Sequence, residues 1–231
     1  MRGLAGILQN PAVWRGDACP RMPQAGLPSG FADLDTELPA DGWPTGMLTE
    51  MLPADAGIGE LRVLAPALAM LSAQGRAIAW IAPPYLPYAP ALAAAGIDPA
   101  SIVIVRADKA QDALWATEQA LRSNACGAVL AWPMRPRFAD LRRLQLAAEG
   151  KQCLALLFRP AGAAGESSPA PLRLGLAAQP EGLAVHILKR RGRPAAHPVL
   201  LPALSVAHRH ALDRTSFAAA AARDSGRACH A

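Results

Sequence analysis

The sequence predicts an α/β fold with three layers, in which helices cover both faces of a mainly parallel sheet that has an antiparallel C-terminal extension. Five short apolar runs, each typical of a buried strand, alternate with segments of helical periodicity. Continuous apolar strands separated by helices indicate a parallel sheet covered on both faces. After residue 158 the alternation stops, and two strand-like runs joined by Gln-Pro-Glu-Gly predict a hairpin.

The individual elements follow from these runs. Strands are expected at residues 47–52, 77–82, 102–105, 127–132 and 153–158, and the antiparallel extension is expected over 172–204. Helices are expected over 60–73, where Pro66 should bend the early turns, over a segment that Asp108 caps and Ser123 ends, and over 138–149. Residues 159–171 are rich in Gly, Ala, Ser and Pro and predict a mobile loop.

The chain is expected to form one domain with a tail at each end. Residues 1–26 contain three prolines and predict an N-terminal arm, residues 27–204 form the domain, and residues 205–231 form an alanine-rich, flexible tail. No apolar run reaches the ~18 residues that span a membrane, and the N-terminus has no signal cleavage site. We therefore expect a cytoplasmic protein with no membrane contact.

Composition excludes some classes of site. The four cysteines lie far apart, so no zinc site is expected, and Cys126 and Cys153 are predicted to be core residues. Trp80 and Trp132 lie in apolar runs and are also expected in the core. The net charge of +5 permits contact with nucleic acid without establishing it.

A glycine-rich loop follows the first predicted strand. This is the layout of a P-loop, G-x-x-x-x-G-K-[ST], whose backbone N–H groups cradle phosphates. Gly57 and Gly59 are present, but Glu60 occupies the lysine position and Leu61 the Ser/Thr position. A carboxylate repels a triphosphate and leucine cannot bind Mg²⁺. We therefore expect a vestigial P-loop, with no catalytic residues, no metal and no cofactor; ATP binding without hydrolysis stays an alternative.

Two groups of cations are candidate DNA- or partner-binding residues. Lys189, Arg190, Arg191 and Arg193 lie within five residues at a strand end and form a compact positive site suited to phosphates. The other group, Arg135 and Arg137, follows a predicted strand in the loop MRPRF. The alternative for the first group is a solvated strand end.

Four motifs in order carry a family resemblance: VWRG (13–16), LPSGFADLD (27–35), GWPTGMLTEML (42–52) and LKRRGRP (188–194). Together they resemble the ImuA family, the RecA-like accessory proteins of SOS-induced translesion DNA synthesis, which are more distantly related to RecA and SulA. The resemblance implies a RecA-like P-loop-type fold. It also implies an ImuB-like Y-family protein and an error-prone polymerase as partners, with RecA and DNA as further candidates.

The resemblance to RecA fails at the chemical positions. Pro83 and Pro84 stand where RecA has a catalytic glutamate, Trp132 stands at the position of the magnesium-orienting aspartate, and Arg159 stands at that of the nucleotide-sensing glutamine. Phosphoryl transfer needs the metal, the lysine and a water-positioning group together. The expected function is thus that of a pseudo-ATPase, a non-catalytic adaptor in the mutagenic repair of DNA damage. The alternatives are a SulA-like cell-division inhibitor and a divergent DNA-stimulated ATPase.

Overall fold

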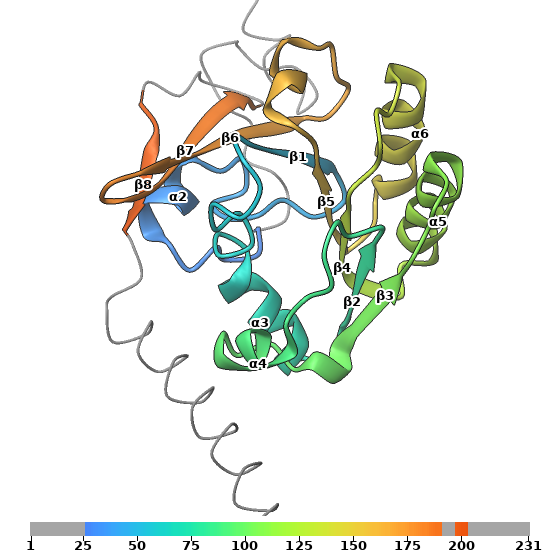
Figure 1. Cartoon of the computed structure of the whole chain (residues 1–231), viewed down its shortest axis with the longest axis horizontal. Helices are drawn as coiled ribbons and strands as arrows, with labels where there is room; N and C mark the ends of the chain where they lie inside the picture. The colour runs from blue at the N-terminus through green and yellow to red at the C-terminus, as the bar shows by residue number, and fades with distance from the viewer. Residues whose placement is uncertain (1–25, 191–196, 203–231) are drawn as a thin grey trace, which may run out of the picture.

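A single mixed sheet of eight strands organises the part of the chain that the computed structural model describes, residues 26–190 and 197–202 (Figure 1). The order across the sheet is β3-β2-β4-β5-β1-β6-β7-β8. The strands are β1 (Leu48–Pro53), β2 (Ala77–Ile81), β3 (Ile102–Val105), β4 (Cys126–Ala131), β5 (Leu154–Phe158), β6 (Leu172–Gln179), β7 (Gly182–Lys189) and β8 (Val199–Pro202). Apart from Gly26, the predicted N-terminal arm lies outside the described residues, as does the predicted tail.

The strand predictions are confirmed to within one residue at each end, and β2 and β4, the runs AIAWI and CGAVLA, are neighbours in the sheet. The first six strands in the order pair in parallel, with β1 between β5 and β6. The predicted hairpin is the antiparallel pair β6 and β7, and β8 continues it. The antiparallel extension therefore begins one strand later than expected, because β6 pairs in parallel with β1.

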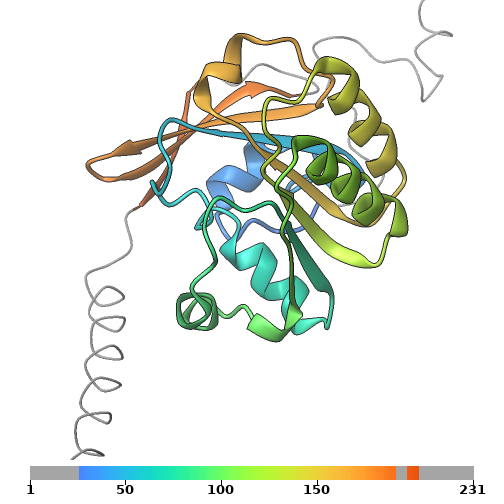
Figure 2. The same cartoon turned by 45° about the vertical axis from the view of Figure 1, so that its right-hand side comes forward.

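Helices cover both faces of the sheet (Figures 1 and 2). One face carries α2 (Ala32–Glu37), α3 (Ala65–Ala73) and α4 (Ala89–Ala94), and the other carries α5 (Ala110–Ser123) and α6 (Phe138–Ala148). Two short 3₁₀ helices, η1 (Pro99–Ser101) and η2 (Ala161–Gly165), complete the elements. None of the helices within the described ranges has the length and apolarity that a bilayer crossing requires.

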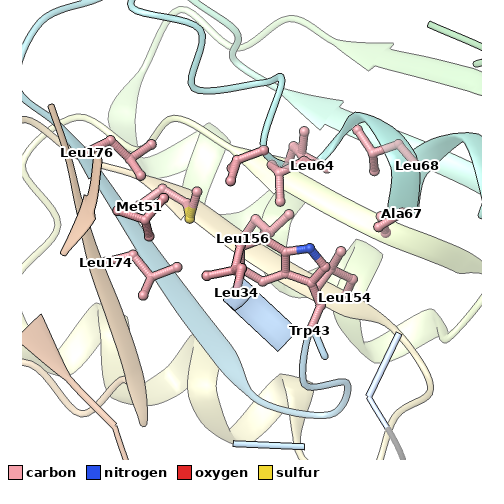
Figure 3. Packing of buried hydrophobic residues seen from close by; sticks show 14 of the residues in the cluster. Leu34, Trp43, Met51, Leu64, Ala67, Leu68, Leu154, Leu156, Leu174 and Leu176 are labelled. Carbon is pink, nitrogen blue, oxygen red and sulfur yellow. The ribbon is translucent and has the colours of Figure 1, made fainter. Parts of the chain in front are cut away.

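The larger hydrophobic cluster lies between the sheet and the α2–α3 layer (Figure 3). Trp43 is fully buried at its centre, with Leu34 from α2, Leu64 at the start of α3 and Met51 from β1 in the same cluster. The backbone of Trp43 exchanges two hydrogen bonds with Leu27, at 2.7 and 2.9 Å. The segment before β1 is therefore fastened to the core by one aromatic side chain and one β-bridge.

Two predicted helix starts are wrong. The helix expected from residue 60 is α3, which begins at Ala65 after turns over residues 60–64, and Pro66 lies in its first turn. A proline is favourable there because the first-turn N–H groups have no partner inside the helix; Pro66 therefore starts the helix and does not bend it. The N-cap of α5 is Lys109, and the Asp108 side chain makes no cap hydrogen bond.

We expect Trp43→Ala to lower the free energy of unfolding by about 3–5 kcal/mol, because it opens a cavity in the main core. Trp115→Ala is the matched control, since Trp115 is 61% exposed on α5, and its effect should stay within about 0.5 kcal/mol. Urea unfolding followed by far-UV circular dichroism measures both. Equal effects of the two substitutions would contradict the assigned role of Trp43.

Candidate binding site at the carboxyl edge of the sheet

The loops that follow the parallel strands meet at one edge of the sheet, which is where ligands bind in open α/β sheets. These are residues 54–64 after β1, 82–88 after β2, 106–109 after β3, 132–137 after β4 and 159–171 after β5. All the residues at which the chain departs from RecA chemistry lie in these loops. Their contacts define what this edge can bind.

The glycine loop after β1 is closed on itself. Gly57 and Gly59 adopt left-handed backbone conformations, with φ of 81° and 94°. The Gly57 N–H donates to Oε1 of Glu60 at 3.3 Å. In a P-loop such an N–H group would donate to a phosphate, and here it already has a partner. Leu61 packs against the main core cluster, and α3 begins only at Ala65. This geometry favours a structural turn over a phosphate cradle, because the first N–H groups of α3 lie beyond the loop glycines.

Aromatic side chains occupy the carboxyl ends of β4 and β5. The rings of Trp132 and Phe158 stack at a centroid distance of 4.6 Å and an interplanar angle of 7°. The ring centroids of Trp80 and Trp132 lie 5.6 Å apart, and the two ring planes are tilted by 40°. Trp80 is buried, as predicted, whereas Trp132 is partly exposed. Within the described ranges no cluster of His, Cys, Asp or Glu has the makings of a metal site.

A buried ion cluster at the centre of the sheet escaped the sequence analysis. Glu50 on β1 is fully buried, and its Oε1 accepts from Nη1 of Arg159 at 3.1 Å and from Oγ of Ser168 at 2.8 Å. Its Oε2 accepts from Nε of Arg173 at 2.6 Å. The second guanidinium nitrogen of Arg159 is paired with Glu166, so two cations face two carboxylates. We name Glu50, Arg159, Glu166, Ser168 and Arg173 the Glu50 cluster.

The Glu50 cluster also corrects the prediction that residues 159–171 form a mobile loop. Arg173 donates to the carbonyl of Ala163 at 2.7 Å and to those of Ala164 and Glu166 at 3.1 Å. The segment contains η2 and covers the part of the sheet beside β1. Composition indicated mobility, because small residues carry no apolar signal, but buried guanidinium groups bind the backbone carbonyls and hold the segment in place.

One sequence signal for this cluster was available. Glu50 is the single charged residue within the strand-like run Met47–Leu52, and a carboxylate buried in a sheet must be paired. Arg159 directly follows one apolar run, and Arg173 is the second residue of another. Their pairing required knowledge of which strands flank β1.

The basic strand end has contacts within the domain. Nζ of Lys189 donates to the Ser168 carbonyl at 2.8 Å, and Nη1 of Arg190 pairs with the Glu37 carboxylate at 2.7 Å. Arg191 and Arg193 lie outside the described residues. Lys189 and Arg190 therefore connect β7 to the covering segment and to α2, and whether the group also binds a partner stays a prediction.

The second basic group, Arg135 and Arg137, is exposed in the loop after β4. Nε of Arg137 lies 3.5 Å from Asp140, at the start of α6. Three strands separate β4 from β7, a distance of about 19 Å at the usual strand spacing. The structure therefore does not combine the two basic groups into one patch.

An open hollow lies beside this loop, between the ends of β2, β3 and β4. Its volume is about 510 Å³, and its walls include Pro83, Leu86, Arg106, Lys109, Trp132 and Met134. Of these, the sequence analysis names Pro83, which stands where RecA has a catalytic glutamate, and Trp132, which is expected in the core. Arg106, Lys109, Leu86 and Met134 were not singled out, because each is an ordinary surface residue in the sequence.

Burial makes the thiols of the two described cysteines, Cys126 and Cys153, harder to deprotonate. Cys153 is 1% exposed and burial raises the pKa of its thiol to about 12. Burial also raises the pKa of the half-buried Cys126. Because the thiolate is the nucleophile and the metal ligand, burial disfavours both of these roles for the two thiols.

Comparison with known proteins relates part of the chain to SulA. No family model matches the sequence. Over 98 residues, 42% of this chain and 58% of the relative, it is 34% identical to the cell division inhibitor SulA of Edwardsiella piscicida. The crystal structure of SulA from Pseudomonas aeruginosa aligns at 28% identity and a TM-score of 0.41, over 51% of this chain and 99% of that chain. The chain thus spans little more than half the length of the curated relative. The sequence similarity over 98 residues supports the predicted distant relation to SulA, whereas the ImuA resemblance rests on the four motifs alone.

We expect Glu50→Gln to lower the free energy of unfolding by about 3–5 kcal/mol, because it leaves Arg173 buried without a carboxylate partner and Arg159 with Glu166 alone. Glu181→Gln, in the exposed turn between β6 and β7, should change it by less than about 0.5 kcal/mol. Urea unfolding measures both substitutions. A double-mutant cycle with Arg159→Met should give non-additive losses, and additive losses would contradict direct pairing of Glu50 with Arg159.

Proposed function

We propose that this chain is a non-catalytic, RecA-like binding protein of the bacterial response to DNA damage. The observation that carries the proposal is the occupation of the would-be phosphate site by the chain's own Glu60, which accepts from the Gly57 N–H. The stack of Trp132 on Phe158, where an ATPase needs a carboxylate for magnesium, supports it. A RecA-like origin is supported by a glycine loop that follows a central parallel strand, flanked by layers of helices.

Two partner classes have separate support. The similarity to the cell division inhibitor SulA supports an inhibitor that binds a cytoskeletal protein of cell division. The four motifs support an adaptor that binds an ImuB-like Y-family protein and an error-prone polymerase. Of the two, the comparisons favour the division inhibitor, because they provide a measured similarity over 98 residues.

The structure explains why one motif has little power to separate these partners. Within GWPTGMLTEML, Trp43 and Met51 belong to the main core and Glu50 to the ion cluster. The motif therefore reflects internal packing, which proteins of the same fold can share whatever partner they bind. The first motif, VWRG, and most of the last, LKRRGRP, lie outside the described residues.

Purified proteins from the source cell separate the two classes. The tagged chain is mixed in turn with the cytoskeletal division protein, the Y-family protein and the error-prone polymerase, with serum albumin as control, and affinity is measured by biolayer interferometry. In parallel, overproduction should cause filamentation if the chain inhibits division. Deletion should lower damage-induced mutation frequency if the chain serves translesion synthesis. Absence of binding to all three proteins, together with neither phenotype, would overturn the proposal.

We expect no ATP hydrolysis above background, with or without single-stranded DNA, because the positions of the lysine, the Ser/Thr and the magnesium-orienting acid hold Glu60, Leu61 and Trp132. Release of inorganic phosphate over hours measures this. The opposing result is DNA-stimulated turnover that Gly59→Ala abolishes in a variant that still has a native circular dichroism spectrum. Turnover unaffected by Gly59→Ala would instead identify a contaminating ATPase.

A further inference from the structure

The hollow between the ends of β2, β3 and β4 is bordered by large apolar side chains that point into solvent. Tyr85 is 75% exposed, Leu86 62%, Tyr88 67% and Met134 70%. Leu86 and Met134 line the hollow, and the two tyrosines belong to the same loop as Leu86. Several exposed large apolar residues around one concavity are typical of an interaction site, because scattered single residues are the normal case on a surface.

The rim is held in this exposed arrangement by its backbone. Residues 83–90 contain four prolines, each of which restricts φ. The base of the loop after β2 is fastened by the Ala82 N–H, which donates to the Val105 carbonyl at 2.8 Å. The loop after β4 is fastened by the Trp132 N–H, which donates to the Ile81 carbonyl at 3.1 Å. A rim that is already ordered loses less conformational entropy on binding than a flexible one.

The charges around the hollow are predominantly positive. Arg106 and Lys109 line it, and Arg135 follows Met134 in the adjoining loop; all three are exposed. Across the described part of the chain, none of these three cations has an acidic partner within ion-pair distance. Asp108 is the single acid in the lining. The complementary ligand is therefore apolar at its centre and acidic at its flanks.

We infer that this hollow is the docking groove for an acidic segment of a partner protein that inserts an apolar anchor between Leu86, Trp132 and Met134. The inference rests on the proposed function as a binding protein and assigns it a surface. A peptide is favoured over single-stranded nucleic acid because the walls contain mostly proline, alanine, leucine and methionine. In addition, grooves for single-stranded nucleic acid combine a track of cations with several aromatic side chains on which bases stack. This lining holds two cations, Arg106 and Lys109, and a single aromatic ring, that of Trp132.

The test uses the full chain and a fluorescein-labelled twelve-residue probe with Leu-Trp-Leu at its centre and Asp or Glu at the other nine positions. Fluorescence anisotropy at low salt should show saturable binding. A probe with Ala-Ala-Ala at the centre, and one with lysine in place of the acids, should each bind at least about tenfold more weakly. Absence of saturable binding of the first probe up to 1 mM would overturn the inference.

Substitutions in the chain locate the site. Leu86→Asp, Met134→Asp and the pair Arg106→Glu with Lys109→Glu should each weaken probe binding by about tenfold or more, since each removes an anchor contact or a complementary charge. Leu146→Asp is the matched control, because Leu146 is 58% exposed on α6, away from the hollow, and it should stay within about twofold. Equal effects of Leu86→Asp and Leu146→Asp, in folded variants, would overturn the inference.

The same variants separate this inference from the proposed function. If a division or translesion protein binds the chain and the hollow variants bind it equally well, the proposed function stands and the groove assignment fails. If the probe binds at the hollow, while none of the three partner proteins binds and neither phenotype is seen, the groove stands and the proposed function fails. Displacement of the probe by a twenty-nucleotide oligo-dT at physiological salt, with direct binding of that oligonucleotide lost in Arg106→Glu, would identify a nucleic-acid site and overturn the inference.

Discussion

The carboxylate of Glu50, buried between two arginines, is the constraint on which the centre of this structure depends. A buried carboxylate costs several kcal/mol of desolvation unless its charge and its lone pairs are satisfied. Arg159 after β5 and Arg173 on β6 satisfy it from both sides of β1. Arg159 also pairs with Glu166, and Arg173 donates to the carbonyls of residues 163, 164 and 166. These contacts hold the segment 159–171 against the sheet.

This arrangement decides which part of the carboxyl edge is open. Near β1 and β5 this edge carries Arg159 of the Glu50 cluster, Glu60 as acceptor of the Gly57 N–H, and Trp132 stacked on Phe158. The hollow lies on the other side of Trp132, towards β2 and β3. The chemical centre of an ATPase and the open surface of this chain are therefore neighbouring but different places. The proposed binding role fits this division, because the exposed rim offers contact area outside the filled centre.

The fold was largely predictable and the candidate site was not. The strand predictions hold to within one residue because buried parallel strands are continuous apolar runs that turns interrupt. The predicted start of α3 was wrong because a proline is compatible both with the first turn of a helix and with a bend inside one. The local sequence does not decide between these two positions for Pro66. The prediction of a mobile loop over residues 159–171 was wrong because Arg173, which lies beyond this segment in the chain, binds its backbone carbonyls.

By itself the sequence determined the layers of this protein, the burial of Trp80 and the absence of P-loop lysine and Ser/Thr at residues 60 and 61. These are properties of single residues or of local periodicity. Only the tertiary structure decided that residues 50, 159 and 173 form one ion cluster, and that Leu86, Arg106 and Met134 border one hollow. The physical reason is that parallel strands are joined by long crossovers. The residues that meet at their ends are therefore far apart in the chain, and strand order alone determines which of them are neighbours.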